Sequence, residues 1–169
     1  MKKDLKHYVL TAMFMALACV ATMSIRIPTP GTNGYIHPGD AIVILSGIFL
    51  GPVFGFLAGG IGSALADLFA GYMLYVPITF LIKGMGALMA GYIFQKLGST
   101  TKGQHLSVIL GGICNTILVV FGYFLYESMF YGMAGAAASM PANMVQGIGG
   151  LVIAIVLYPA LHAIPHITD

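Results

Sequence analysis

The sequence has few charged residues. Asp, Glu, Lys and Arg make up only 7% of its 169 residues, against about a quarter in an average soluble domain, while 59% of the residues are hydrophobic. This balance excludes the soluble classes of protein. Because a membrane-spanning helix needs about 20 apolar residues, the length allows about six spans with short loops. We therefore predict an all-α integral membrane protein, one domain of six transmembrane helices over residues 1–169, with no room for a soluble catalytic domain.

Cysteines and catalytic motifs are also scarce. The two cysteines, Cys19 and Cys114, lie in separate apolar segments without C-x-x-C spacing, so we interpret them as small hydrophobic residues of helices. There is no G-x-S-x-G, H-E-x-x-H or G-x-x-x-x-G-K-[ST] motif, and the five histidines form no cluster with metal-ligand spacing. We predict no enzyme activity, no cofactor and no metal site. The small net charge of +2 argues against nucleic acid as a partner.

Two charged residues nevertheless occur inside an apolar stretch. The segment 61–85 is hydrophobic enough to lie in a bilayer, yet it contains Asp67 and Lys83. Each charge costs roughly 2.5–3.5 kcal/mol at the centre of a spanning helix, which points to a function. A break at 70–77 places Asp67 at the end of one helix and Lys83 about two turns into the next, near the same side of the membrane. The two could form a structural ion pair, or one of them, more readily Lys83, could contact a solute.

Apolar runs and helix-breaking residues divide the chain into the expected helices. Three prolines and three glycines exclude a helix at 26–39, which we expect to form a lid loop that reaches over a cavity. Asp40 is expected to N-cap the next helix, residues 127–140 to connect the last two helices, and Pro141 to begin the last one. The expected helices span approximately residues 5–25, 40–50, 53–70, 77–97, 106–126 and 141–162.

The lysines predict the orientation in the cell membrane. If both termini are cytoplasmic, the basic residues outside the apolar segments lie inside, as the positive-inside rule requires, with the exception of Arg26. These residues are Lys2, Lys3, Lys6, Lys96 and Lys102. The same orientation places the lid loop and most polar side chains of the helices in the outer half of the membrane. We therefore expect the outer half to hold a small polar molecule.

Particular side chains in that half suit such a molecule. Asn143 and Gln146 lie three residues apart on one helix face, and their amides offer both donors and acceptors to a heteroaromatic ring with nitrogens and hydroxyl groups. Hydrogen bonds between helices are the alternative role for these amides. Most of the tyrosines could form an interfacial aromatic belt, with one or two stacking on a planar ligand. His37 could contact the ligand or anchor the loop.

The first expected helix has a face of small residues. Ala12 and Ala16 lie four residues apart, a spacing that lets another helix come close in lipid. The partner helix could belong to this same chain or to a separate subunit.

Short motifs in a fixed order give the sequence its resemblance to a known family. The motifs are IPTP at 27–30, YIHPGD at 35–40, LGP at 50–52, ADL at 66–68, PITFLIKG at 77–84 and PANMVQ at 141–146. In this order and spacing the sequence resembles the substrate-binding subunit, or S component, of energy-coupling factor (ECF) transporters. It is most similar to the riboflavin-transporter-like branch, which includes subunits for hydroxymethylpyrimidine and pyridoxine.

The resemblance implies a six-helix membrane subunit that binds a vitamin from outside. It implies association with a transmembrane coupling (T) subunit and two cytoplasmic ATPases, with ATP hydrolysis in those partners and toppling of the loaded subunit in the membrane. Ala12 and Ala16 would meet the coupling subunit, and residues 31–37 would act as the lid. Implied ligand contacts lie at Lys83, Asn115, Glu127, Asn143 and Gln146. Together with the polar residues of the outer half, they give the full candidate set: Asn33, Tyr35, His37, Tyr75, Thr79, Lys83, Asn115, Tyr123, Glu127, Asn143 and Gln146.

The candidate residues also bear on the substrate. Tryptophan is absent, and Tyr, Asn, Gln, Glu and Lys suit a small hydroxylated pyrimidine or pyridine, so we expect hydroxymethylpyrimidine or pyridoxine, with riboflavin as the alternative. A second alternative is an autonomous secondary transporter that couples protons through Asp67, Lys83 and Glu127. Its hallmark, a pair of similar broken helices in two halves, is not evident.

Overall fold

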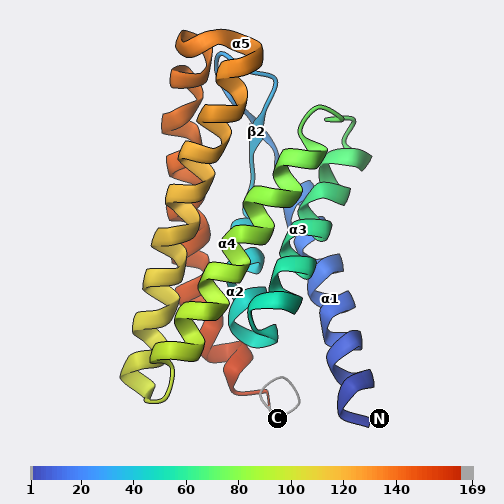
Figure 1. Cartoon of the computed structure of the whole chain (residues 1–169), viewed down its shortest axis with the longest axis vertical. Helices are drawn as coiled ribbons and strands as arrows, with labels where there is room; N and C mark the ends of the chain where they lie inside the picture. Colours follow the sequence, from blue (N-terminus) through green and yellow to red (C-terminus); the bar gives the residue numbers. More distant parts are fainter. Residues whose placement is uncertain (1, 165–169) are drawn as a thin grey trace.

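The computed structural model describes residues 2–164, with side chains from residue 5 onward, and this part of the chain is almost entirely helical (Figure 1). The described residues form five helices and one pair of two-residue strands. In chain order these are α1 (Lys2–Ser24), β1 (Ile27–Pro28), β2 (Tyr35–Ile36), α2 (Asp40–Leu50), α3 (Pro52–Phe69), α4 (Val76–Leu97) and α5 (Thr101–His162).

Helix α5 is a hairpin of two helical arms. Gly132, with φ 71° and ψ 170°, is its non-helical residue, and near it the chain reverses direction at the top of Figure 1, so that residues 101–131 and 133–162 run antiparallel. Glycine adopts a positive φ without the steric cost that a Cβ imposes. The predicted connector over 127–140 is therefore wrong, because all of these residues except Gly132 are helical.

The predicted start of the last helix is also wrong. Pro141 lies inside the second arm of α5. The alanines just before it favour a helix and extend the arm upstream of the proline, and neighbouring groups in a membrane bundle can satisfy the carbonyl that a proline leaves free. The described chain thus has five helices where six were predicted. Those long and apolar enough to cross a membrane are α1, α3, α4 and α5, whereas α2 has 11 residues.

Helix α4 lies in the middle of the bundle. It packs against α2, α3 and α5, while α1 packs on α2 and α3 at one side (Figure 1). The crossing of α2 and α4 is tight enough to need glycine, because a Cβ on Gly91 would lie 2.5 Å from the carbonyl oxygen of Gly47 and 2.8 Å from the nitrogen of Pro52. Backbone atoms cannot give way cheaply at such distances.

We expect Gly91→Ala to destabilise the protein by roughly 1–3 kcal/mol, because the added methyl group would force α2 and α4 apart. Gly149→Ala is the matched control, since nothing lies within 4 Å of a Cβ at that helical position. Alanine there should be neutral or stabilising. Thermal unfolding in detergent measures both variants, and equal stability of the two would contradict the close crossing.

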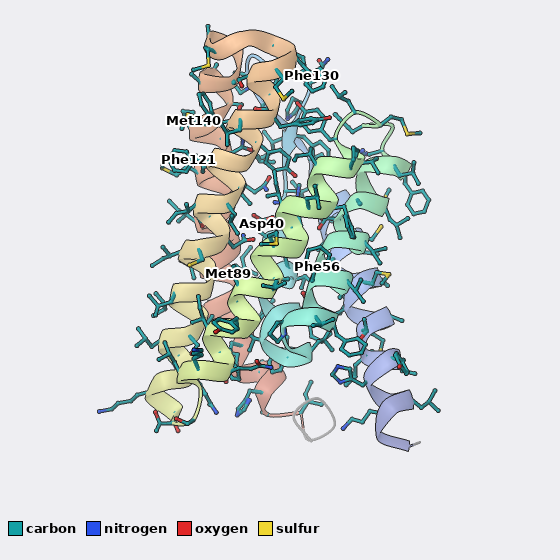
Figure 2. The ribbon with its side chains drawn as sticks, viewed as in Figure 1. Asp40, Phe56, Met89, Phe121, Phe130 and Met140 are labelled. Atoms are coloured by element: carbon teal, nitrogen blue, oxygen red, sulfur yellow. The ribbon has the colours of Figure 1, made fainter. Side chains whose placement is uncertain are left out.

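Apolar and polar residues occupy different parts of the bundle. A buried apolar cluster that includes Phe14, Leu45 and Tyr158 lies towards the end where α1 begins and α5 ends. Asp40 lies in the interior, whereas Phe121 and Phe130 are 54% and 52% exposed and point away from the bundle (Figure 2). Large exposed apolar side chains of this kind occur on every long helix. An outer surface of this composition suits lipid rather than water.

Candidate functional site

A short hairpin covers one end of the bundle. Strands β1 and β2 pair antiparallel, with Pro28 opposite Tyr35, and they lie at the end opposite the start of α1 (Figure 1). The loop is closed by turn residues. Tyr35 of β2 and His37, the residue that follows β2, are buried, and each is only 9% exposed. The predicted lid loop over 26–39 therefore contains a strand pair that buries two candidate residues.

A small cavity lies beneath this hairpin. Its volume is about 20 Å³, which is room for about one water molecule. The lid loop, the end of α3, the start of α4 and both arms of α5 contribute to its wall. The lining residues are Thr29, Gly34, Tyr35, His37, Asp67, Tyr75, Thr79, Tyr123, Glu127, Asn143 and Gln146.

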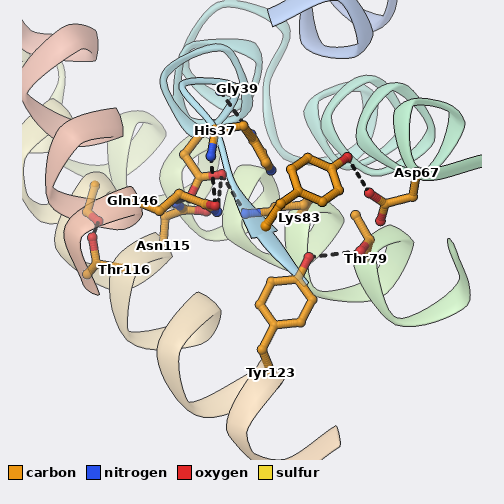
Figure 3. Close-up of polar contacts among 12 residues, drawn as sticks. His37, Gly39, Asp67, Thr79, Lys83, Asn115, Thr116, Tyr123 and Gln146 are labelled. Atoms are coloured by element: carbon orange, nitrogen blue, oxygen red, sulfur yellow. Dashed lines mark hydrogen bonds and ion pairs between the residues drawn. The ribbon is translucent and has the colours of Figure 1, made fainter. Parts of the chain in front are cut away.

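A buried ion pair lies below the cavity. The Nζ atom of Lys83 is 2.5 Å from Oδ1 of Asp40, and both side chains are fully buried. Asn115 donates to the second carboxylate oxygen of Asp40 at 3.2 Å, and Gln146 donates to Oδ1 at 3.3 Å (Figure 3). Gln146 in turn accepts a hydrogen bond from the backbone N–H of His37 at 3.1 Å. The lid is therefore tied through Gln146 to the charged centre of the bundle.

This network corrects two predictions. Asp40 is not an N-cap: Gly39 holds that position without a side-chain cap bond, and Asp40 lies in the first turn of α2 with its carboxylate turned inward. One of the two alternatives left open for Asp67 and Lys83, an ion pair between them, is also wrong, because Lys83 binds Asp40 instead. A fully buried ammonium group needs a close counter-ion, and the start of α2 provides it.

The two remaining buried acids have hydroxyl donors in place of cations. Tyr35 donates to Oδ1 of Asp67 at 2.7 Å, and Tyr75 donates to Oε1 of Glu127 at 3.0 Å. Ser139 donates to the other oxygen of Glu127. Among the described residues, neither acid has a Lys, Arg or His nitrogen within 4 Å. Both acids line the cavity, where they are 4% and 2% exposed.

The surroundings of Tyr35 and His37 determine the protonation state of each side chain. Burial, reinforced by the nearby Asp67, raises the pKa of Tyr35 far above its usual value, so its phenol remains a donor. Burial and then the charge of Lys83 lower the pKa of His37 to about 3, against a smaller opposing effect of Asp40. His37 is therefore neutral at pH 7, and its Nδ1 accepts from the N–H of Gly39 at 3.1 Å.

Because His37 is neutral in the folded protein, we expect the free energy of unfolding to depend on pH. Its pKa in the folded protein lies below the ordinary value of 6.5, so the unfolded chain binds the extra proton and stability falls as the pH drops below about 6.5. Between pH 7 and pH 5 the loss should be about 2 kcal/mol. Equilibrium unfolding in detergent at both pH values measures it. His37→Asn keeps an acceptor without a titrating group, and a loss of the same size in that variant would contradict this assignment.

The amide of Asn143 has an unused donor. Asn143 is 4% exposed, lines the cavity, and its Nδ2 atom has no hydrogen-bond partner among the described residues. A buried polar atom without a partner costs free energy unless something else satisfies it. The wall of the cavity therefore combines two carboxylates and one available donor.

The structure brings most of the predicted site residues together. Eight of the eleven candidates line the cavity. Lys83 and Asn115 lie below it in the network of Asp40, and Asn33 is exposed at the turn of the lid, where it lines a second, open cavity of about 510 Å³. The two cavities share Gly34 and Tyr75 in their walls.

Sequence reasoning missed several residues of the site. Asp67 was left out of the candidate set although it lines the cavity, and so were Thr29 and Gly34 of the lid. Asp40 and Ser139 were missed as partners of Lys83 and Glu127. One signal was available in the sequence. The acids of the apolar segments outnumber the bases there, so not every acid can pair with a Lys or Arg. Within the described part of the chain, no three His, Cys, Asp or Glu side chains gather closely enough to hold a metal ion.

Ala12 and Ala16 of α1 do not pack inside the chain. Ala12 and Ala16 are exposed, whereas Ala18 is fully buried. Intrachain packing through Ala12 and Ala16, one of the two predicted alternatives, is thus not what the structure has. Their face is open to lipid or to another protein.

The sequence and the fold are similar to those of known transport proteins. A family model described as "ECF-type riboflavin transporter, S component" matches residues 2–163. An uncharacterised protein of Pyrococcus woesei is 38% identical over 134 residues, which cover 79% of this chain and 86% of that protein. The thiamine precursor transporter HmpT of Lactococcus lactis subsp. cremoris is 31% identical over 160 residues, 94% of this chain and 89% of HmpT.

Two further comparisons agree with these. The riboflavin transporter FmnP of Bacillus subtilis is 28% identical over 163 residues, with 85% of each chain covered. A structure described as the S component of a bacterial ECF transporter has a TM-score of 0.71 and 23% identity over 94% of this chain and 96% of that one, which shows the same fold. Proteins of this kind are integral to the cell membrane and are not enzymes. The chain belongs to the S component family of ECF-type riboflavin transporters, the substrate-binding membrane components of vitamin uptake systems.

Proposed function

We propose that this chain binds a small hydroxylated nitrogen heterocycle, hydroxymethylpyrimidine or pyridoxine, in the cavity beneath the lid. The observation that carries the proposal is the ring of buried polar groups around that cavity. Asp67, Glu127 and Asn143 face it from three helical segments, and the lid closes it with Tyr35 and His37. Ligand sites typically combine an enclosed space with a few polar groups that fix the orientation of the ligand.

The relatives support a small substrate. The thiamine precursor transporter HmpT is 31% identical over 94% of this chain, and the riboflavin transporter FmnP is 28% identical over 85% of it. Riboflavin remains the second candidate, favoured by the description of the family and by the open cavity of about 510 Å³ next to the closed one. A movement of Tyr75, which stands between the two, would join them into a larger site.

Binding requires the lid to move. A cavity of about 20 Å³ is far below the roughly 300–1,000 Å³ of ordinary small-molecule sites. The bonds between Tyr35 and Asp67 and between His37 and Gln146 hold the lid over the cavity. We propose that these bonds break to admit the ligand and re-form around it.

The proposal includes six membrane spans and a transport complex. The spans are α1, α2, α3, α4 and the two arms of α5, with both termini in the cytoplasm and the lid outside. A T subunit and two cytoplasmic ATPases are the proposed partners, and ATP hydrolysis takes place in the ATPases. The exposed Ala12 and Ala16 of α1 are the proposed contact with the T subunit, because small side chains allow close helix packing in lipid.

We expect Ala12→Trp and Ala16→Trp to abolish vitamin uptake by cells while leaving binding by the purified chain unchanged. Each indole would hold the partner helix away without touching the cavity. Leu17→Trp is the matched control, because Leu17 is 48% exposed on another side of the same helix. Uptake of labelled vitamin and equilibrium binding measure the two properties. Normal uptake by cells that carry Ala12→Trp or Ala16→Trp would contradict the proposed contact with the T subunit.

Equilibrium binding tests the proposed function. Isothermal titration of the purified protein with hydroxymethylpyrimidine, pyridoxine and riboflavin should give tight binding of one of the two smaller compounds and weaker binding of riboflavin. If riboflavin alone binds tightly, riboflavin is the substrate in place of the two smaller compounds. The alternative of an autonomous proton-coupled transporter is weakened by the pairing of Lys83 with Asp40, which leaves Asp67 and Glu127 as its carriers. Solute uptake by proteoliposomes of this chain alone, driven by a proton gradient, would favour that alternative.

A further inference from the structure

The interior of the bundle carries more negative than positive groups. Among the side chains that the structure describes, three carboxylates are buried there, those of Asp40, Asp67 and Glu127, against the single ammonium group of Lys83. Lys83 binds Asp40 at 2.5 Å, and His37 is neutral. Asp67 and Glu127 are thus left without a cation at the wall of the same cavity.

The groups that face these two acids do not supply the missing charge. Glu127 faces the phenol of Tyr75 and the hydroxyl group of Ser139. Asp67 faces the phenols of Tyr35 and Tyr123 and the hydroxyl group of Thr79, with the ammonium group of Lys83 further away and already paired. Arg26 lies on the exposed side, 5.9 Å from the ring centre of Tyr35. Of the two acids, Glu127 is the one whose hydrogen-bond partners among residues 5–164 are all neutral.

A second observation supports a polar ligand in the cavity. The Nδ2 donor of Asn143 is buried at the cavity wall and has no partner among the described residues. A ligand that satisfies the whole wall must therefore offer donors or positive charge to Glu127 and Asp67 and an acceptor to Asn143.

We propose that Glu127 selects a heterocycle that is bound as a cation, an aminopyrimidine protonated on the ring nitrogen next to its amino group. The N–H of the ring and one N–H of the amino group would form an amidinium edge that donates to the carboxylate, while a hydroxyl group or the second ring nitrogen accepts from Asn143. Because such a pyrimidine is only weakly basic, binding takes up a proton from water near neutral pH. This inference rests on the proposed function and narrows it, since pyridoxine lacks that edge.

Two compounds of nearly equal size test whether the protein recognises the charge of the ligand or only its shape. One is 4-amino-5-hydroxymethyl-2-methylpyrimidine, and the other is its 4-oxo counterpart, which presents a carbonyl oxygen in place of the amino group. The protein should bind the amino compound at least about 100-fold more tightly, because a buried carboxylate that loses its partner costs several kcal/mol. Titrations of the unmodified protein in buffers of different ionisation enthalpy should reveal uptake of about one proton with the amino compound.

Variants then assign the effect to Glu127. Glu127→Gln should reduce the preference for the amino compound to less than about tenfold and abolish the proton uptake. Ser128→Ala is the matched control at the neighbouring position, because the hydroxyl group of Ser128 donates to the carbonyl oxygen of Leu125 and does not line the cavity, so this variant should keep both the preference and the proton uptake. The proton uptake needs no variant, so the inference stays testable if Glu127→Gln fails to fold.

The outcomes are distinguishable. Equal binding of both probes, or tight binding of the amino compound without proton uptake, would overturn the cationic ligand and leave the proposed function in place. Binding of neither probe, with tight binding of pyridoxine or riboflavin, would also overturn the inference. Binding of none of the four compounds would count against the proposed function itself.

Discussion

Replacing Asp40 by asparagine is expected to destabilise the folded protein by about 3–5 kcal/mol, because it leaves the fully buried ammonium group of Lys83 without a counter-ion. The asparagine is nearly isosteric and keeps an acceptor for Asn115, so lost packing contributes little. Lys83→Met should be similarly costly, because it leaves the carboxylate of Asp40 uncompensated. Thermal or denaturant unfolding in detergent measures both.

The double variant Asp40→Asn with Lys83→Met completes this test. Removing both charges should cost clearly less than the sum of the single variants, since neither charge is then left alone. Lys96→Met is the control on the same helix, where the cation is exposed and should contribute less than about 1 kcal/mol. Additive losses, or a single-variant loss no larger than that of Lys96→Met, would contradict the central role of the pair.

Gly34→Val is expected to weaken vitamin binding roughly 10- to 100-fold and to destabilise the protein by no more than about 1–3 kcal/mol. Gly34 lines both cavities, and even a Cβ there would lie 3.0 Å from Oγ1 of Thr29 and 3.3 Å from Oε1 of Glu127. The valine would therefore occupy ligand space beneath the lid. Equilibrium binding and thermal unfolding measure the two effects.

The neighbouring residue provides the control for Gly34. Asn33 is exposed and lines only the outer cavity, so Asn33→Val should change the affinity by less than about threefold. This outcome would remove Asn33 from the site predicted from the sequence. An affinity of Gly34→Val equal to that of the unmodified protein would place the ligand elsewhere than beneath the lid.

The buried ion pair illustrates what the sequence could and could not indicate. Composition and hydropathy predict that Lys83 lies in a membrane-spanning helix and needs a partner, but they do not choose among the acids. Asp67 is 16 positions away on the preceding helix, whereas Asp40 is 43 positions away and follows a Pro-Gly pair, which is a typical N-cap context. The local sequence favours Asp40 as an N-cap, whereas the buried ammonium group of Lys83 needs a carboxylate partner. In the folded protein Asp40 pairs with Lys83.

Helix α5 shows a different limit. The apolar runs at its two ends indicate helices, but the residues around the reversal include two glycines, Gly132 and Gly135, as well as alanines. A positive φ is available to any of these glycines, and only the packing of the two arms selects Gly132. The lid was easier to predict, because prolines and glycines exclude a helix whatever the tertiary structure. The burial of Tyr35 and His37 depends on how the lid packs on the bundle, since β2 contains only Tyr35 and Ile36.

Native mass spectrometry of the protein, released gently from detergent after expression in vitamin-containing medium, tests the central claim most directly. We expect the unmodified protein to carry an adduct with the mass of a small nitrogen heterocycle. The fraction of protein with this adduct should be much smaller for Gly34→Val. A protein that carries no adduct, and that binds no compound of the vitamin panel at micromolar concentration, would contradict the central claim. Asp67 and Glu127 would then be better explained as proton carriers of an autonomous transporter.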